Sequence, residues 1–440
     1  MNHPNMTQHI VNEHSAAHGM NAETADSELF DVIVVGGGPA GATAAADLAS
    51  KGHSVLLLDK AGRIKPCGGA IPPRLIRDFR IPDELICARI SSARMVPPSA
   101  KFVDMPIDNG GYVGMVDRES FDEWLRIRAS DQGAVRRRGT FERLTRDADG
   151  MSVIHYTPRL AASEAADEKP AADEKPAASE KPAEVRVRGR MIIGADGARS
   201  GVARAAIPGA DKIPFVFAYH EIVRAPTTAS EAYDPARCDV HYNGRFSPDF
   251  YSWVFPHGDT MSIGTGSANK GFSLRGATAD LRKHLGLENA ATIRREGAPI
   301  PLKPLKKWDN GRDIIVVGDA AGVVAPSSGE GIYYAMACAR FAADAVHQAL
   351  VTRDARALSL ARKTFMKAHG RVFWILGIMQ WVWYRNDRLR ERFVSICKDK
   401  DVQRLTWEAY MNKELVKSDP MAHVRIFFKD LGHLMGLART

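Results

Sequence analysis

A glycine-rich turn between a short strand and a helix dictates how the ordered part of the chain must begin. Asp31–Val35 is typical of a buried strand, and the motif Gly36-x-Gly38-x-x-Gly41 follows it directly. A helix is expected over Ala40–Ser50 and a second apolar strand over Ser54–Leu58. Strand, glycine turn, helix and strand within about 30 residues form a βαβ unit, which implies a parallel sheet.

The same spacing indicates a dinucleotide-binding site. The first glycine permits the tight turn, the second lets a pyrophosphate approach the backbone, and the third lets helix and strand pack closely. The helix N-terminus favours the anion, and the acid 23 residues after Gly36 can bind ribose hydroxyls. The alternative is a glycine turn in an unrelated α/β fold. The candidate cofactor-binding residues of this unit are Gly36, Gly38, Ala40, Gly41, Asp59 and Lys60.

Two later glycine segments bear on which dinucleotide is bound. Gly194-Ala-Asp-Gly-Ala-Arg-Ser200 follows the strand Met191–Ile193, and Gly318-Asp-Ala-Ala-Gly322 follows the strand Asp313–Val317. An aspartate at a strand end can bind a ribityl hydroxyl, and a helix N-terminus places positive potential near a flavin ring. Each segment taken singly is an ordinary Asp-Gly turn. The candidate residues are Asp196, Gly197, Gly318, Asp319, Gly329 and Gly331.

Together the three segments resemble the flavoprotein family typified by para-hydroxybenzoate hydroxylase, over most of residues 30–350. The resemblance implies bound FAD, with Asp319 as the ribityl contact and Asp196-Gly197 as the family's second motif. Arg118 stands where many members have an arginine that contacts the flavin. No second GxGxxG motif is visible, so a nicotinamide donor is expected to dock transiently.

The expected fold is therefore mixed α/β, with a Rossmann-like FAD-binding domain, an antiparallel-sheet substrate domain and a helical C-terminal region. Three Ala/Glu/Lys/Pro repeats interrupt a strand pair and predict a disordered insert. The expected boundaries are a flexible leader over 1–29, FAD-binding segments at 30–75, 112–212 and 310–350, an insert at 161–183, substrate-binding segments at 76–111 and 213–309, and helices over 351–440.

Composition and charge exclude several classes of protein. The 440 residues are 45% apolar and 25% charged, which is typical of a globular chain. The 5 cysteines form no CxxC pair, so neither a disulfide framework nor a zinc site is expected, and no secretory signal is visible. The cysteine usage and the N-terminal sequence therefore predict that the protein works in the reducing cytoplasm. The net charge of +8 suits a basic surface or an anionic membrane, and no nucleic-acid-binding signature accompanies it.

Two further segments resemble motifs of geranylgeranyl reductases: Lys65-Pro-Cys-Gly-Gly-Ala-Ile-Pro72 and Phe250-Tyr-Ser-Trp-Val-Phe-Pro256. Gly322–Met336 and Met411–Leu415 extend the resemblance, which is closest to the reductases of chlorophyll and bacteriochlorophyll synthesis over about residues 30–437. It implies saturation of three C=C bonds of a geranylgeranyl group to phytyl, as the free diphosphate or as the pigment ester. NADPH or reduced ferredoxin would supply the electrons, and a pigment synthase is a candidate partner.

An isolated alkene has no carbonyl to polarise it, so its reduction needs a proton and a hydride in a dry slot that stabilises positive charge. Tyr251, Trp253 and Phe255 alternate along one strand and face one side, so they are expected to line that slot with Pro256. An ordinary sheet core is the alternative. Cys67, Tyr251 and Trp253 are the candidate catalytic residues, and Gly68 and Gly69 are expected close to the flavin. Cys67 is otherwise a small buried hydrophobe. His220, Tyr219 and His257 remain open as proton donors.

Two rival functions and one ambiguous segment remain. A flavin hydroxylase of the same fold would consume oxygen, and a non-catalytic prenyl-pigment carrier would need no flavin motif. The apolar stretch Val372–Tyr384 is too short to span a bilayer. It predicts a core helix, a lid on the prenyl tunnel or a peripheral contact with the cytoplasmic face of the membrane, next to Arg385, Arg388, Arg390 and Arg392.

Overall fold

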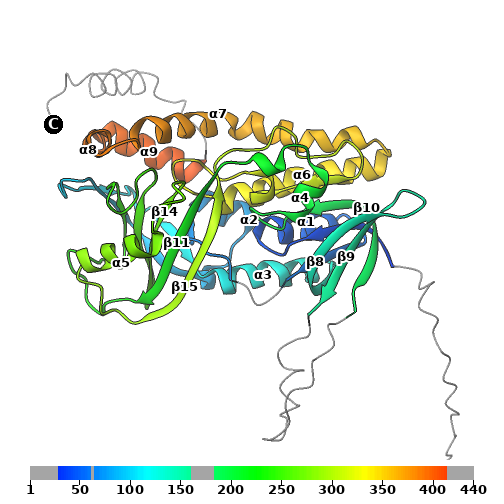
Figure 1. Cartoon of the computed structure of the whole chain (residues 1–440), viewed down its shortest axis with the longest axis horizontal. Coiled ribbons are helices and arrows are strands. Elements are labelled where there is room, and N and C mark those ends of the chain that lie inside the picture. Colours follow the sequence, from blue (N-terminus) through cyan, green and yellow to red (C-terminus); the bar gives the residue numbers. More distant parts are fainter. Residues whose placement is uncertain (1–27, 61–63, 160–182, 414–440) are drawn as a thin grey trace, which may run out of the picture.

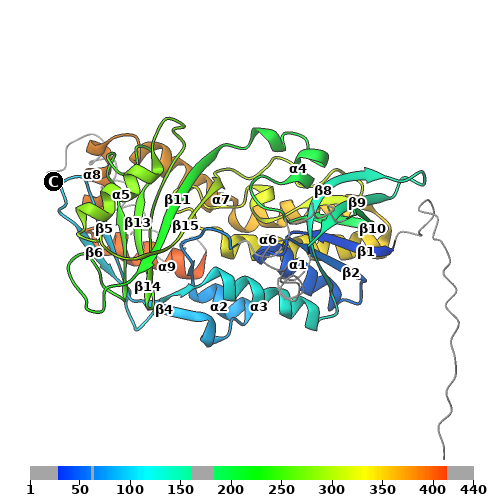
Figure 2. The ribbon, with the colours of Figure 1, turned by 60° about the horizontal axis from the view of Figure 1, so that its bottom comes forward.

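A computed structural model describes residues 28–60, 64–159 and 183–413. The leader, apart from its last two residues, and the repeat insert, apart from its last residue, lie outside the described residues. Two sheets occupy the two ends of an elongated molecule, and a long helix runs along it (Figures 1 and 2). The strand β1 begins at Leu29, which the sequence had assigned to the leader, because Leu29 pairs with Arg188 of a neighbouring strand.

The first sheet has a parallel core in the order β16–β10–β1–β2–β8. The strand β9 pairs antiparallel with both β8 and β10, as expected for the strands that flank the repeat insert. Register aligns Val35, Leu58, Gly194 and Val316, so these strands end at one edge. The strands are β1 (Leu29–Val35), β2 (Val55–Asp59), β8 (Val135–Arg146), β9 (Ser152–Pro158), β10 (Val185–Gly194) and β16 (Ile314–Val316).

Helix α1 explains how this sheet is covered. Its sequence is rich in alanine, and nearly every residue is buried because α1 is enclosed by the sheet, α3 and α6. Small side chains let these layers approach closely. The helices of this half are α1 (Pro39–Ala49), α2 (Pro73–Phe79), α3 (Arg118–Asp131), α4 (Gly201–Ala206) and α6 (Ile332–Thr352), with short 3-10 turns η1 (Asp83–Leu85), η2 (Ala210–Lys212) and η3 (Gly318–Ala321).

The second sheet has the order β15–β11–β14–β13–β12–β5–β6, antiparallel except between β12 and β5. Its strands are β5 (Ser92–Val96), β6 (Val103–Pro106), β11 (Phe215–Arg224), β12 (Arg237–His241), β13 (Ser252–His257), β14 (Thr260–Ser267) and β15 (Thr292–Pro301). Helix α5 (Leu274–His284) packs on β11 and β14. A third, small sheet has the order β3 (Ala70–Ile71), β7 (Val113–Val116) and β4 (Ile86–Ile90).

The C-terminal segment is helical as far as it is described. The turn η4 (Ala355–Leu358) leads into α7 (Ser359–Trp383), which packs along α6, and then into α8 (Asp387–Ile396) and α9 (Lys400–Asn412). Helix α9 returns to the second sheet, where the Trp407 indole donates to the Met105 carbonyl at 3.2 Å. Among the described residues, no helix is both long enough and apolar enough to cross a membrane.

Candidate active site

The three glycine segments meet at the carboxyl edge of the parallel sheet. The Ala195 amide donates to the Val35 carbonyl at 2.8 Å, and the Val317 amide donates to the Gly194 carbonyl at 2.9 Å. A Cβ at Gly318 would lie 2.8 Å from the Cβ of Ala40. Segments that lie far apart in sequence therefore form one surface at the start of α1.

The glycines of the first motif differ in the space around them. Gly36 has φ +109°, and a Cβ there would lie 2.3 Å from the Ala195 carbonyl oxygen. A Cβ at Gly41 would lie 1.8 Å from the Gly36 oxygen, so close packing excludes a side chain. At Gly38 a Cβ would meet no described atom within 4 Å. The open backbone before α1 thus fits the pyrophosphate of a dinucleotide.

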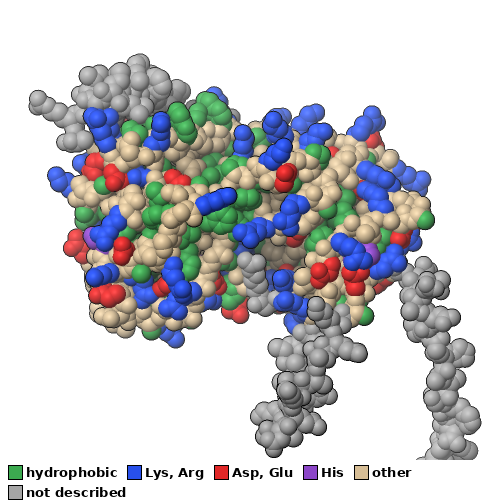
Figure 3. All heavy atoms as spheres, in the orientation of Figure 1, with side chains coloured by type: hydrophobic (Ala, Val, Ile, Leu, Met, Phe, Trp, Pro, Cys, Tyr) green, Lys and Arg blue, Asp and Glu red, His purple; other side chains and the backbone are tan. Residues whose placement is uncertain are grey.

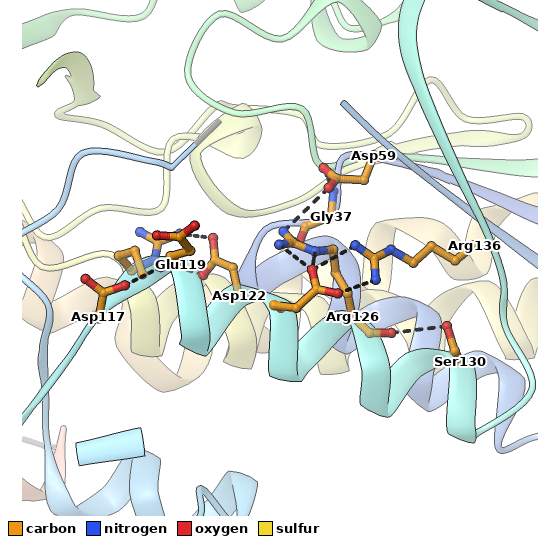
Figure 4. A network of polar contacts seen from close by, with 10 residues as sticks. Gly37, Asp59, Asp117, Glu119, Asp122, Arg126, Ser130 and Arg136 are labelled. Atoms are coloured by element: carbon orange, nitrogen blue, oxygen red, sulfur yellow. Dashed lines mark hydrogen bonds and ion pairs between the residues drawn. The ribbon is translucent and has the colours of Figure 1, made fainter. Parts of the chain in front are cut away.

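Asp59 belongs to a polar network that sequence reasoning did not find (Figure 4). Its Oδ1 accepts from the Gly37 amide at 3.1 Å, and its Oδ2 lies 3.5 Å from Arg126 of α3. Glu123 accepts hydrogen bonds from Arg126 and Arg136. The hydrogen bond from Arg136 is the main reason that the pKa of Glu123 falls to about 2. Lys60 is exposed next to this network. Arg126 thereby orients the acid expected to bind ribose.

The two other aspartates have different environments. Asp196 accepts from the amides of Gly201 at 2.6 Å and Val202 at 3.2 Å, so its carboxylate caps the start of α4. Burial raises the pKa of Asp196. Asp319 instead faces the cavity described below and forms an ion pair with Lys65, which sequence reasoning did not single out. A Cβ at Gly331 would lie 3.7 Å from Asp319 Oδ1.

Arg118 and Cys67 lie together on the cavity wall. The Arg118 guanidinium donates to both Asp122 oxygens, at 2.8 and 2.6 Å, within α3. Burial alone would lower the pKa of Arg118, but the Asp122 carboxylate and the Cys67 thiol raise it, so the guanidinium stays charged. Arg118 is the residue that the resemblance implies as a flavin contact, and Asp122 holds it in a fixed orientation on the cavity wall.

A cavity of about 690 Å³ extends from the glycine turns to the C-terminal helices. The rings of Tyr251, Trp253 and Phe255 line it, with centroids 6.0 and 6.2 Å apart. The segment with Cys67 approaches this wall, because a Cβ at Gly68 would lie 2.9 Å from the Phe255 ring. Pro256 is buried on the alternate face of β13 and is not among the lining residues described.

The far wall of the cavity comes from helices of the C-terminal segment. One face of α7 contributes Val372, Leu376 and Met379, and α9 contributes Trp407 and Tyr410. The apolar stretch Val372–Tyr384 therefore lies in α7 and closes the cavity with one face. The opposite face of the helix is exposed to solvent.

The structure separates the three candidate proton donors. His220 lines the cavity, but Ser262 at 2.8 Å and Glu296 at 3.0 Å hold its two ring nitrogens. Tyr219 donates to Glu221 at 2.8 Å on the other side of β11. Burial lowers the pKa of His257 to about 4, so its imidazole is neutral at pH 7. Among the described residues, no cluster of His, Cys, Asp or Glu could hold a metal ion.

Comparisons with known proteins agree with this arrangement. Models of an NAD(P)-binding Rossmann-like domain and of a lycopene cyclase protein match residues 34–81 and 272–430. A geranylgeranyl diphosphate reductase from Rhodobacter capsulatus is 56% identical over 408 residues, covering 93% of this chain and 98% of that protein. The chloroplastic geranylgeranyl diphosphate reductase of Oryza sativa is 35% identical, covering 92% and 86%.

Among solved structures, a geranylgeranyl bacteriochlorophyll reductase-like protein from Thermoplasma acidophilum superposes with a TM-score of 0.73 at 22% identity, covering 90% of this chain and 99% of that one. This likeness confirms the mixed α/β fold with a Rossmann-like domain. The identities over nearly full length confirm the resemblance read from the motifs. The chain belongs to the geranylgeranyl diphosphate reductase family.

Proposed function

We propose that this protein is an FAD-dependent reductase that saturates the three isolated C=C bonds of a geranylgeranyl group to give phytyl, in the synthesis of bacteriochlorophyll. One observation carries the proposal: a single cavity reaches from Pro39 and Asp319, in two of the glycine segments, to an aromatic and aliphatic wall that fits a prenyl chain. The names of the relatives support the substrate class.

The residues that would hold the cofactor are those of the converging glycine segments. Gly38 leaves room for the pyrophosphate, Asp59 faces the ribose end, and Asp319 with Lys65 faces the ribityl end. Bound flavin would supply hydride chemistry. Arg118 is held next to Cys67 at the cavity wall. Both residues would contact the ring system of the bound flavin.

The aromatic wall supports the reduction of an unactivated alkene. Tyr251, Trp253 and Phe255 line the cavity, and the face of an aromatic ring stabilises positive charge that develops on carbon. Tyr251 donates to the Ser328 carbonyl, and the Trp253 indole donates to Ser262 at 3.0 Å, so both rings are oriented by hydrogen bonds at their polar ends. Their apolar parts exclude water from the slot.

We further propose that the exposed face of α7 contacts an anionic membrane surface. Trp374, Ile378 and Trp381 lie on one helical stripe, and the two indole side chains are 68% and 67% exposed. The Arg385 guanidinium lies 5.0 Å from the centroid of the Trp381 ring. Lys and Arg side chains are spaced along the upper edge of the molecule, where α7 runs (Figure 3). Aromatic residues beside cations suit the membrane interface.

Arg390 does not belong to that surface, although the sequence grouped it with the other arginines. It is buried, where it donates to the carbonyls of Pro248 and Tyr384 and pairs with Asp387. These contacts fix α8 against the end of α7 and the loop between β12 and β13. The proposed membrane contact therefore uses the outward face of α7 and its neighbouring Arg385.

The deciding experiment offers the purified FAD-loaded protein two substrates and two electron donors. Geranylgeranyl diphosphate or geranylgeranyl-bacteriochlorophyll is combined with NADPH or with reduced ferredoxin, and product masses are followed. A gain of two hydrogens per step, ending at six, is expected with at least one combination. Products heavier by an oxygen atom would favour the hydroxylase. Tight binding of the pigment with no change in mass would favour the carrier.

A further inference from the structure

A buried ion pair lies on the cavity wall, between the glycine segments and the aromatic residues. Glu330 precedes α6, and Lys413 ends α9 with φ +53°, so the pair joins segments 83 residues apart. The two side chains are 9% and 2% exposed. The Lys413 ammonium also lies 3.6 Å from the centroid of the Tyr410 ring. Burying two charges is costly, and the fold retains this pair at the site of reaction.

Neighbouring glycines locate Glu330 relative to the rest of the site. A Cβ at Gly329 would lie 3.3 Å from the Tyr251 hydroxyl, and one at Gly331 would lie 3.7 Å from Asp319 Oδ1. Glu330 is thus placed between the first ring of the aromatic wall and the aspartate expected at the flavin ribityl. Both Glu330 and Lys413 line the cavity.

One oxygen of Glu330 is uncommitted. Oε2 accepts from Lys413, whereas Oε1 is buried without a hydrogen-bond partner among the described residues. A buried carboxyl oxygen without a partner is costly and calls for a functional explanation. A carboxyl group that lines the cavity and has one oxygen free of hydrogen bonds can serve as a proton donor there.

Burial favours a proton on this carboxyl group. Burial raises the pKa of Glu330, against the opposing effect of Lys413, and burial lowers the pKa of Lys413. Both shifts reduce the cost of moving the shared proton from the ammonium to the carboxylate. The histidines are less suited, because both nitrogens of His220 are hydrogen-bonded and His257 is neutral.

We propose that Glu330 donates the proton that completes each C=C reduction, and that Lys413 returns a proton to it. The inference rests on the proposed function. The alkene accepts a hydride from reduced flavin at the more substituted carbon and a proton from Glu330 at the other carbon, which converts C=C into CH–CH. The proton that Glu330 donates is the one it has received from Lys413, so donation leaves a carboxylate beside a neutral amine. The amine then takes a proton from water and can pass it to Glu330 for the next reduction.

The test compares purified, flavin-loaded variants in a single turnover. Glu330→Gln with Lys413→Met replaces the buried pair by neutral groups, so neither partner is left as a lone buried charge. Flavin content, the rate of flavin reduction and saturation of geranylgeranyl diphosphate or its pigment ester are measured. We expect flavin content and flavin reduction near those of the wild type and saturation slower by about 100-fold or more, the usual effect of losing a general acid.

Two further variants test whether the effect depends on the position of the Glu330 carboxyl group and is specific to it. Glu330→Asp retains the charge but withdraws the carboxyl by one methylene, and saturation should fall about 10-fold with flavin reduction unchanged, since donation depends on hydrogen-bond reach. Asp344→Asn is the control: it removes a surface carboxylate of α6 that pairs with Lys51, and it should leave every rate unchanged. Saturation at the wild-type rate by the double variant, or by Glu330→Asp if the double variant loses flavin, would overturn the inference. Absence of saturation in the wild type itself would instead reject the proposed function.

Discussion

Gly38 differs from the other two glycines of its motif in having free space where a side chain would stand. Gly36 and Gly41 meet backbone atoms at 2.3 and 1.8 Å, so any substitution there disturbs the fold. Gly38 has φ −75°, which any residue can adopt, and a side chain would enter only the region proposed for the pyrophosphate. A substitution at Gly38 should therefore impair cofactor binding without disturbing the fold.

Gly38→Val should give a folded protein that purifies without flavin, because the added methyl groups occupy the space that the pyrophosphate needs. Flavin content is measured from the visible absorbance, and folding from the thermal midpoint. Gly377→Val is the matched control, since a Cβ at Gly377 also meets no described atom within 4 Å but lies in α7. Flavin retained at wild-type stoichiometry by Gly38→Val would refute the proposed position of the cofactor.

His241 makes stability depend on pH. Burial, with smaller contributions from His284 and Arg237, lowers its pKa to about 3, compared with about 6.5 in an unfolded chain. Between those values the unfolded chain binds a proton that the folded protein does not, so stability falls as pH falls. From pH 6.5 to pH 5 this histidine should cost about 2 kcal/mol. Replacing His241 by Gln should flatten the dependence of unfolding midpoint on pH, and an unaltered slope would contradict the assignment.

Helix α7 has two faces with different tasks. Val372, Leu376 and Met379 line the cavity, whereas Trp374 and Trp381 are turned to solvent. Trp383, close in sequence to Trp381, is 5% exposed and packs in a cluster with Phe393 of α8. The core, lid and membrane interpretations of this stretch therefore apply to different residues of one helix.

Replacing Trp374 and Trp381 by Ser should weaken flotation with anionic liposomes at low salt and leave the thermal midpoint within about 2 °C, because exposed substitutions cost little. Replacing Trp383 by Ser should instead destabilise the fold by about 3 kcal/mol, since it empties a buried site. If the double surface variant binds liposomes as well as the wild type does, the membrane contact is not made by this face.

Segments that follow strands of the first sheet, strands of the second sheet and the C-terminal helices all line the cavity, so neither sheet forms it alone. Its walls come from the glycine turns of the first sheet, from β13 of the second sheet and from α6, α7 and α9. A prenyl chain in which three double bonds are reduced would have to slide through this space to present each bond in turn. Cavity length should therefore control how many bonds are reduced, independently of flavin binding.

Ala409→Phe on α9 adds a ring to the cavity wall. We expect unchanged flavin content and a product mixture that stops at the dihydro and tetrahydro stages, measured by mass after exhaustive incubation. The wild type should reach the hexahydro product under the same conditions. Complete saturation by Ala409→Phe would show that the prenyl chain does not extend along α9.

Local patterns predicted the nucleotide-binding half well. The helix expected over residues 40–50 is α1 at Pro39–Ala49, and the strand expected over 54–58 is β2 at Val55–Asp59. Hydrophobic periodicity and turn chemistry depend on near neighbours, so they are visible in the sequence. The alternation of Tyr251, Trp253 and Phe255 likewise places three rings on one side of β13, and all three line the cavity.

Contacts between distant segments could not be predicted from local sequence patterns. Arg126 reaches Asp59, Lys65 reaches Asp319, and Lys413 reaches Glu330 only because helices and loops from separate parts of the chain are packed together. Parallel pairing of β5 with β12 likewise joins residues about 145 positions apart. The motifs, and the chemistry that they permit, can be predicted from local sequence, because a motif is defined by its residue types and by the backbone conformation of a few neighbouring residues. Which charges become buried partners, and which face of α7 closes the cavity, follow only from tertiary packing, because burial and pairing depend on what the rest of the chain places alongside.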